Sequence, residues 1–411
     1  MCMERYKKLI ERINYFAFLA LLIALPFPQP IIHFCWLVWA YTWLLEFRYV
    51  DRTNLRRSRG VLYLSIGVGV WLVWNIVSLL WAQDTHAAWS AIERYISLLA
   101  IPLIGCFGLN THYNLRTCVR VLAVSALASI GMYLFTHYWV MNHELALDRY
   151  TCAPRVSLDL LHMDNLLLDI KHRVHYANVL CLLVPCLVLL RKPFSKVLTA
   201  LLSLALLVVI LWTGSRIGLV ALALVLGITV VRWALRQPKT VKVISIVATA
   251  LVLGAVCVAG VAFHPRSAGH SIEDEPRMTV WKTALEQPTD YLAYGLGAGN
   301  STDYLVERYQ QREWEIFYLR RFSPHNQFLG VCMDLGLVAA VLFVLFWIGI
   351  PWFFAGDKRY WAWCALGICL PVMCTEMILG GIEGIVFVNI LFLLGTLLPD
   401  STRQTDAAGK P

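Results

Sequence analysis

The chain has 411 residues, of which 59% are hydrophobic and only 15% are charged. A soluble domain of this length needs a more highly charged surface, so the composition excludes an ordinary soluble protein. The net charge of +9 does not indicate nucleic-acid binding, because the Lys and Arg residues are spread over many short segments and form no single basic patch.

Long apolar runs recur along the chain and approach the roughly 20 residues that a helix needs to cross a bilayer. They are too long and too uniformly apolar for barrel strands, and a helix satisfies its own backbone in lipid. We therefore predict an all-α, polytopic protein with residues 1–411 in a single integral membrane domain. The twelve predicted spans lie near residues 13–28, 31–47, 61–81, 93–109, 118–140, 174–190, 197–213, 217–233, 243–262, 326–350, 360–378 and 384–398.

The distribution of basic residues predicts the orientation of the spans. Most of the 35 Lys and Arg residues lie at the two termini and after the even-numbered spans, which places both termini in the cytoplasm by the positive-inside rule. No small-residue cleavage site follows the first apolar run, so we expect a retained anchor and not a signal peptide.

Two segments on the opposite, outward side are long, residues 141–173 and residues 263–325. Long segments of this kind are often functional. The second follows the ninth predicted span and contains helix-like stretches at residues 278–287 and 302–320. An amphipathic helix at the membrane interface, or over a cavity, is expected in the later stretch.

Three arginines stand at outward ends of predicted helices: Arg173, Arg216 and Arg277. An arginine in or near hydrocarbon costs at least about 2.5 kcal/mol unless it is compensated. Each of them alone could be an interfacial residue whose charged end reaches water. Together on one side of the membrane, they would form a binding site for phosphate or pyrophosphate, which matches the planar guanidinium donors.

His325 begins the tenth predicted span, directly after the longest outward segment. A neutral imidazole there could take a proton from a hydroxyl group, although a lone histidine at a membrane interface is more often structural. Asp334, Glu376 and Glu383 are further acidic candidates in or at the ends of late spans. The pattern indicates no metal site, because no ligand cluster with suitable spacing is present.

Three groups of residues follow one another along the chain. These are Thr213-Gly214-Ser215-Arg216, Arg277-x-x-x-Trp281 leading to Gly295-Leu296-Gly297-Ala298-Gly299, and His325-Asn326-x-Phe328-Leu329 followed by Asp334-Leu335-Gly336. Together with the predicted topology, they resemble the bacterial O-antigen ligase family, which is related to O-antigen polymerases and protein O-oligosaccharyltransferases.

The resemblance implies a glycosyltransferase of GT-C-like architecture in the bacterial inner membrane, with its site facing the periplasm. Such enzymes transfer O-antigen polysaccharide from undecaprenyl pyrophosphate to lipid A–core during lipopolysaccharide biosynthesis, without a metal or other cofactor, and inversion at the anomeric carbon is expected. The implied roles are pyrophosphate binding for Arg216, Arg277 and Arg173 and catalysis for His325, with possible support from Asn326, Asp334 and Glu383. An O-antigen polymerase and, from another class, a lipid-linked oligosaccharide flippase stay open as alternatives.

Overall fold

The computed structural model describes residues 2–47, 59–107, 111–151, 173–189, 202, 205–211, 213, 215–262 and 276–398. Within this part of the chain there are helices and turns and no strand, so the predicted all-α class is confirmed. The chain forms two compact units, each made from two segments. Unit 1 comprises Met1–Val50 and Leu109–Cys257, and unit 2 comprises Asp51–Gly108 and Val258–Pro411. The single membrane domain over residues 1–411 stays a prediction.

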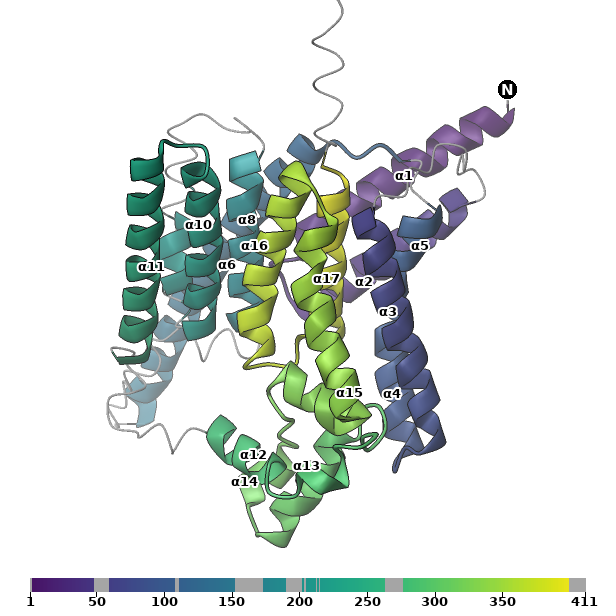
Figure 1. Ribbon diagram of the computed structural model, residues 1–411. Helices are drawn as coiled ribbons and strands as arrows, with labels where there is room; N and C mark the ends of the chain where they lie inside the picture. The colour runs from purple at the N-terminus through teal and green to yellow at the C-terminus, as the bar shows by residue number, and fades with distance from the viewer. Residues whose placement is uncertain are drawn as a thin grey trace, which may run out of the picture. The chain divides into compact units, whose positions relative to one another are not determined.

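Unit 1 is built from long, mostly apolar helices (Figure 1). Helix α1 packs on α2 and α6, and α8 packs on both α6 and α10. Aromatic side chains fill the first of these contacts, since the ring of Phe18 lies 5.8 Å from that of Trp39 and 4.6 Å from that of Tyr113. The helices are α1 (Cys2–Ala24), α2 (Gln29–Glu46), α6 (Leu115–Thr151), α8 (Arg173–Leu189), α10 (Arg216–Ala234) and α11 (Lys239–Ala262).

Unit 2 combines apolar helices with a group of short helices, α12 to α14, that follows residue 275 (Figure 1). Helix α17 packs on α4 and α16, and α15 packs on α3 and α16. The α-helices are α3 (Arg59–Val77), α4 (Thr85–Ile96), α5 (Ala100–Phe107), α12 (Pro276–Ala284), α13 (Ser301–Gln311), α14 (Glu315–Leu319), α15 (Gln327–Gly349), α16 (Gly356–Met373) and α17 (Ile382–Thr396). The 3-10 turns are η3 (Ser78–Leu80), η4 (Ser97–Leu99), η8 (Pro288–Asp290), η9 (Ile350–Phe353) and η10 (Ile378–Gly380).

Five helical segments in the described residues are long and apolar enough to cross a membrane. They are Arg59–Leu80, Thr85–Ile104, Leu115–Phe135, Arg216–Ala234 and Gln327–Phe353, and two shorter apolar helices cover Val174–Leu189 and Ile382–Thr396. These segments agree with a helical membrane protein. The count of twelve spans and the GT-C-like architecture stay predictions.

Several helix boundaries differ from those expected from hydropathy; α1, for example, covers Cys2–Ala24, whereas the first span is predicted near residues 13–28. The segment predicted as 93–109 starts at Thr85, because the Asp84 carboxylate accepts hydrogen bonds from the backbone N–H groups of His86 and Ala87 and caps the helix. Helix α6 continues to Thr151, past the predicted end at residue 140. The segment predicted as the outward loop 141–173 therefore begins with helix, and its residues 152–172 lie outside the described ranges.

Helix α15 is interrupted at Gly336, whose φ of 87° is in the left-handed region. The interruption divides α15 into a first half that starts at Gln327 and a longer second half. Residues 292–300, which we call the glycine loop, pair with the backbone at the break. Three hydrogen bonds of 2.9 Å make this connection, from Leu296 N to Met333 O, from Gly297 N to Asp334 O and from Leu337 N to Leu292 O. They satisfy peptide groups that a break in an apolar helix would otherwise leave unpaired.

The other side of the glycine loop packs against the turn between α3 and α4. The Ala298 N–H donates to Ser78 Oγ at 3.0 Å, and the Asp84 N–H donates to Asn300 Oδ1 at 2.6 Å. A Cβ atom on Gly297 would lie 2.5 Å from Cα of Ala82, so a larger residue does not fit there. The glycines thus serve close backbone packing between these two elements of unit 2.

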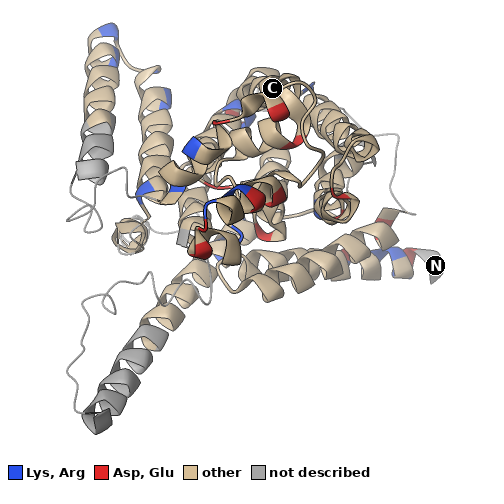
Figure 2. Cartoon of the chain, turned by 90° about the horizontal axis from the view of Figure 1, so that it is seen from below, with Lys and Arg blue, Asp and Glu red and all other residues tan. Residues whose placement is uncertain are grey.

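Aromatic side chains and ion pairs hold α12, α13 and α14 together. The stretch predicted as one helix over residues 302–320 is two helices, because the chain turns at Glu313, where φ is 57°. The rings of Tyr309 and Phe317 still lie 5.4 Å apart. Basic and acidic residues lie side by side on these short helices in Figure 2, and the ion pairs are Arg308–Asp290, Arg312–Glu286 and Arg321–Asp303.

Candidate active site

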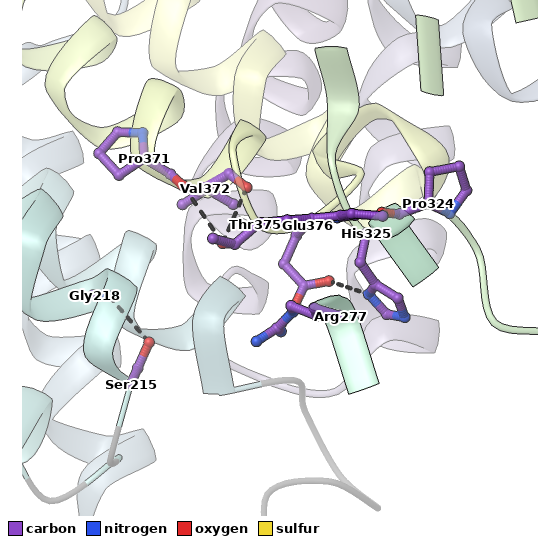
Figure 3. A network of polar contacts seen from close by, with 10 residues as sticks. Ser215, Gly218, Arg277, Pro324, His325, Pro371, Val372, Thr375 and Glu376 are labelled. Atoms are coloured by element: carbon purple, nitrogen blue, oxygen red, sulfur yellow. Dashed lines mark hydrogen bonds and ion pairs between the residues drawn. The ribbon is translucent and has the colours of Figure 1, made fainter. Parts of the chain in front are cut away.

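Two side chains of unit 2, those of Arg277 and His325, contact the Glu376 carboxylate. The Arg277 Nη2 group donates to Glu376 Oε1, and His325 Nδ1 lies 3.0 Å from Glu376 Oε2 (Figure 3). The Glu376 side chain is 11% exposed, whereas those of Arg277 and His325 are each 29% exposed. The arginine and the histidine thus retain surface that a substrate could reach, and the carboxylate between them is largely covered.

The segment that carries His325 is fixed by the start of α15. Asn326 is the N-cap, and its Oδ1 accepts hydrogen bonds of 3.0 Å from the N–H groups of Phe328 and Leu329. His325 has a φ of 45°, a left-handed conformation that turns the chain into the helix. Asn326, expected as a supporting residue, therefore fixes the backbone next to His325 by capping α15.

Trp281 connects the segment before α15 to α12. Its indole Nε1 donates to the carbonyl oxygen of Pro324 at 2.9 Å. Because Trp281 lies four residues after Arg277 on the same helix, it shares a face with that arginine. One side chain thus ties the position of Arg277 to the residue directly before His325.

Glu376 lies in the turn between α16 and α17, and α15 holds this turn in place. Its own N–H donates to the Val372 carbonyl at 2.7 Å, which continues the end of α16. Three residues after Glu376, the N–H of Leu379 donates to Gln327 Oε1 at 2.8 Å. Gln327 is buried in the first turn of α15. The half of α15 that follows His325 therefore also positions the turn that carries Glu376.

The arrangement fits an imidazole that acts as a base. An ionised carboxylate only accepts hydrogen bonds, so His325 Nδ1 carries the proton that points to Glu376. The second nitrogen, Nε2, then holds the lone pair that can take a proton from a hydroxyl group. Glu376 would also stabilise the imidazolium that forms, as a carboxylate does behind other catalytic histidines.

Arg216 and Arg173 belong to unit 1, where they begin two helices in contact. Arg216 is the first residue of α10, which Ser215 caps through a 3.0 Å hydrogen bond from the Gly218 N–H to Ser215 Oγ (Figure 3). Arg173 is the first residue of α8. Gly218 packs on Ala177 of α8, and a Cβ atom at this position would contact the Ala177 methyl group. In unit 1, the two helices that begin with Arg173 and Arg216 are therefore neighbours. In unit 2, Arg277 and His325 contact the same carboxylate.

The other acidic candidates lie apart from the contacts of His325. Asp334 is buried, and its Oδ1 accepts a 2.8 Å hydrogen bond from the N–H of Ser301 at the start of α13. Glu383 is buried in the first turn of α17. Glu376 was one of three acidic candidates in the sequence, but nothing there assigned it to the site. The sequence feature that pointed to Glu376 is an acidic residue at the end of an apolar span, a feature that it shares with the other two. Only the contacts with Arg277 and His325 distinguish Glu376 from them.

Among the described residues, no group of three His, Cys, Asp or Glu side chains lies close enough to hold a metal ion. The residues that gather at Glu376 instead offer guanidinium and imidazole N–H groups, which suit an anionic ligand.

Residues 200–344 match the family model described as O-antigen ligase. This region of the chain is therefore similar to the O-antigen ligase family. It includes Arg216, Arg277 and His325, and Glu376 lies beyond its end. The resemblance seen in the sequence motifs is thereby confirmed. No curated protein matches the chain at a significant level. The match supports ligase-type or polymerase-type chemistry in general terms.

Proposed function

We propose that the protein is an O-antigen ligase that transfers O-antigen polysaccharide from undecaprenyl pyrophosphate to lipid A–core. The observation that carries this proposal is the contact of Glu376 with both Arg277 and His325 in a chain with a region similar to the O-antigen ligase family. It unites a phosphate-binding side chain and a potential base in one place.

In the proposed reaction, the acceptor hydroxyl oxygen attacks the anomeric carbon of the donor. The bond between that carbon and the pyrophosphate oxygen breaks, and its electron pair leaves with undecaprenyl pyrophosphate. The hydroxyl proton passes to Nε2 of His325. Direct displacement by this route inverts the configuration at the anomeric carbon.

Arginines would provide the remaining catalysis. We assign pyrophosphate binding to Arg277, Arg216 and Arg173, because guanidinium groups can stabilise the negative charge that develops on the leaving oxygen. The reaction needs no cofactor under this assignment, since pyrophosphate is already a good leaving group. The proposed setting is the bacterial inner membrane, with twelve spans in a GT-C-like architecture, both termini in the cytoplasm and the site facing the periplasm.

Purified protein in detergent tests this function. The assay supplies a lipid-linked glycan and lipid A–core and separates the products by size. We expect glycan on lipid A–core, and His325→Ala should lower the rate at least about 100-fold, the usual contribution of a general base. His86→Ala is the matched control, because His86 is exposed on α4 and should retain full activity.

The product identifies the reaction. A longer lipid-linked glycan with unmodified lipid A–core would show a polymerase. Translocation of the intact donor across a vesicle membrane, with no new glycosidic bond, would show a flippase. Full transfer activity of His325→Ala would exclude the assigned role of the histidine.

A further inference from the structure

The Glu376 carboxylate contacts both Arg277 and His325. One oxygen accepts a hydrogen bond from Arg277, and the other lies 3.0 Å from His325 Nδ1. Its side chain is 11% exposed, so little water is available to solvate the charge. A carboxylate in such a place depends on the groups that contact it, and loss of one partner increases its dependence on the other.

A pyrophosphate at Arg277 would compete with this carboxylate. Both anions seek the planar N–H fork of the guanidinium, and a pyrophosphate carries more charge than a carboxylate. The two anions also repel each other at short distance. Donor binding at Arg277 therefore weakens the contact between Glu376 and the arginine, whereas the contact between Glu376 and His325 is retained.

We propose that Glu376 is a positioning residue for His325. When the pyrophosphate of the donor binds, the Glu376 carboxylate gives up its contact with Arg277 and keeps its contact with His325. The inference rests on the proposed function and adds a step to it. In the free protein the carboxylate is shared, so it supports His325 only in part. Once the pyrophosphate has bound, the carboxylate supports His325 fully, so the base becomes fully effective only after the donor is in place.

This exchange makes a prediction that a purely structural role does not make. Glu376→Gln removes the negative charge that competes for Arg277 while it keeps a similar side-chain shape. We expect undecaprenyl pyrophosphate to bind the purified variant at least about fivefold more tightly, which is the lower end of typical coupling between two sites. Glycan transfer should fall at least about 100-fold, because His325 loses its support. Binding and turnover thus change in opposite directions.

Two further variants complete the measurement. Glu376→Asp keeps the charge and should restore part of the transfer, with donor affinity near that of the wild type. Glu286→Gln is the matched control, because Glu286 pairs with Arg312 in the same outward segment and is 46% exposed. It should change neither quantity. Equal or weaker donor binding by Glu376→Gln would overturn the exchange, and so would an Asp variant no better than the Gln variant. Wild-type transfer to lipid A–core would still support the proposed function in either case.

The wild-type protein gives a second measurement that needs no stable variant at position 376. The ¹⁵N resonances of His325, assigned by comparison with His325→Ala, are followed while undecaprenyl pyrophosphate is added. We expect Nδ1 to shift in the direction of a stronger hydrogen bond to a carboxylate, since Glu376 Oε2 lies 3.0 Å from this nitrogen. An Nδ1 resonance that does not move at saturating undecaprenyl pyrophosphate would overturn the proposal.

Discussion

At the scale of single residues, the site is held by side chains that do no chemistry themselves. Asn326 caps α15, Trp281 binds the Pro324 carbonyl, and Gln327 binds the N–H of Leu379. These three contacts hold the segments that carry Arg277, His325 and Glu376. A catalytic geometry needs such support, because small displacements of a base lower the rate strongly.

The cap of α15 gives a residue-scale prediction. Asn326→Ala removes the acceptor for two N–H groups and should cost about 1 kcal/mol of stability. The backbone at His325 would lose its fixed direction, so we expect a larger effect on transfer rate than on folding. Asn326→Ser retains a capping oxygen and should keep most of the activity. Both variants are compared by transfer assay and by thermal unfolding in detergent, and an equally inactive Ser variant would contradict the capping role.

At the scale of elements, the interruption of α15 and the glycine loop form one interlocked feature. The backbone amides of the loop complete the hydrogen bonds that the broken helix lacks. Asp334 adds a side-chain hydrogen bond to Ser301 at the start of α13. The first half of α15 is therefore fixed at its end as well as at its start, where His325 lies.

Gly336→Ala tests the interruption. Its φ of 87° disfavours any Cβ, and a Cβ would lie 2.9 Å from the Ala293 carbonyl oxygen. We expect a loss of about 1–3 kcal/mol in the free energy of unfolding, the cost of a strained backbone position. Gly131→Ala in α6 is the control, because its Cβ would meet no atom within 4 Å. The measurement is thermal unfolding of the purified variants, and equal stability of the two would contradict the close packing at Gly336.

Much of the element pattern follows from the sequence, and the residues that differ show why the rest does not. Apolar runs identify α3, α10 and α15, but the run in α15 continues through Gly336 and hides the interruption. The start of α4 depends on a cap by Asp84 and not on hydropathy. In the site, Arg277 and His325 stand out because charge is rare in this chain. Glu376 is 51 residues from His325 and 99 from Arg277, so only the tertiary fold joins them.

At the scale of the whole molecule, charge predicts which ends of the helices face the cytoplasm. The segment between α10 and α11 contains Arg236, and α11 begins with Lys239, whereas α12 to α14 belong to the predicted outward segment 263–325. A phosphatase that is active only outside the cytoplasm should be active when fused after residue 300 and inactive when fused after residue 237. The same fusions with a cytoplasmic reporter should give the reverse pattern. Activity of the phosphatase at both positions would contradict the orientation.

The division of unit 2 into two chain segments affects how the protein is made. Residues 51–108 leave the ribosome before all of unit 1's second segment, and their partners in residues 258–411 follow last. The Ser97 carbonyl, for example, receives its hydrogen bond from Asn389, 292 residues later. Helices α3 to α5 are therefore made long before their partners, and during most of synthesis Ser78 Oγ lacks the Ala298 N–H that donates to it in the finished fold. Premature termination before α17 would leave this early segment unassembled and exposed to quality-control proteases.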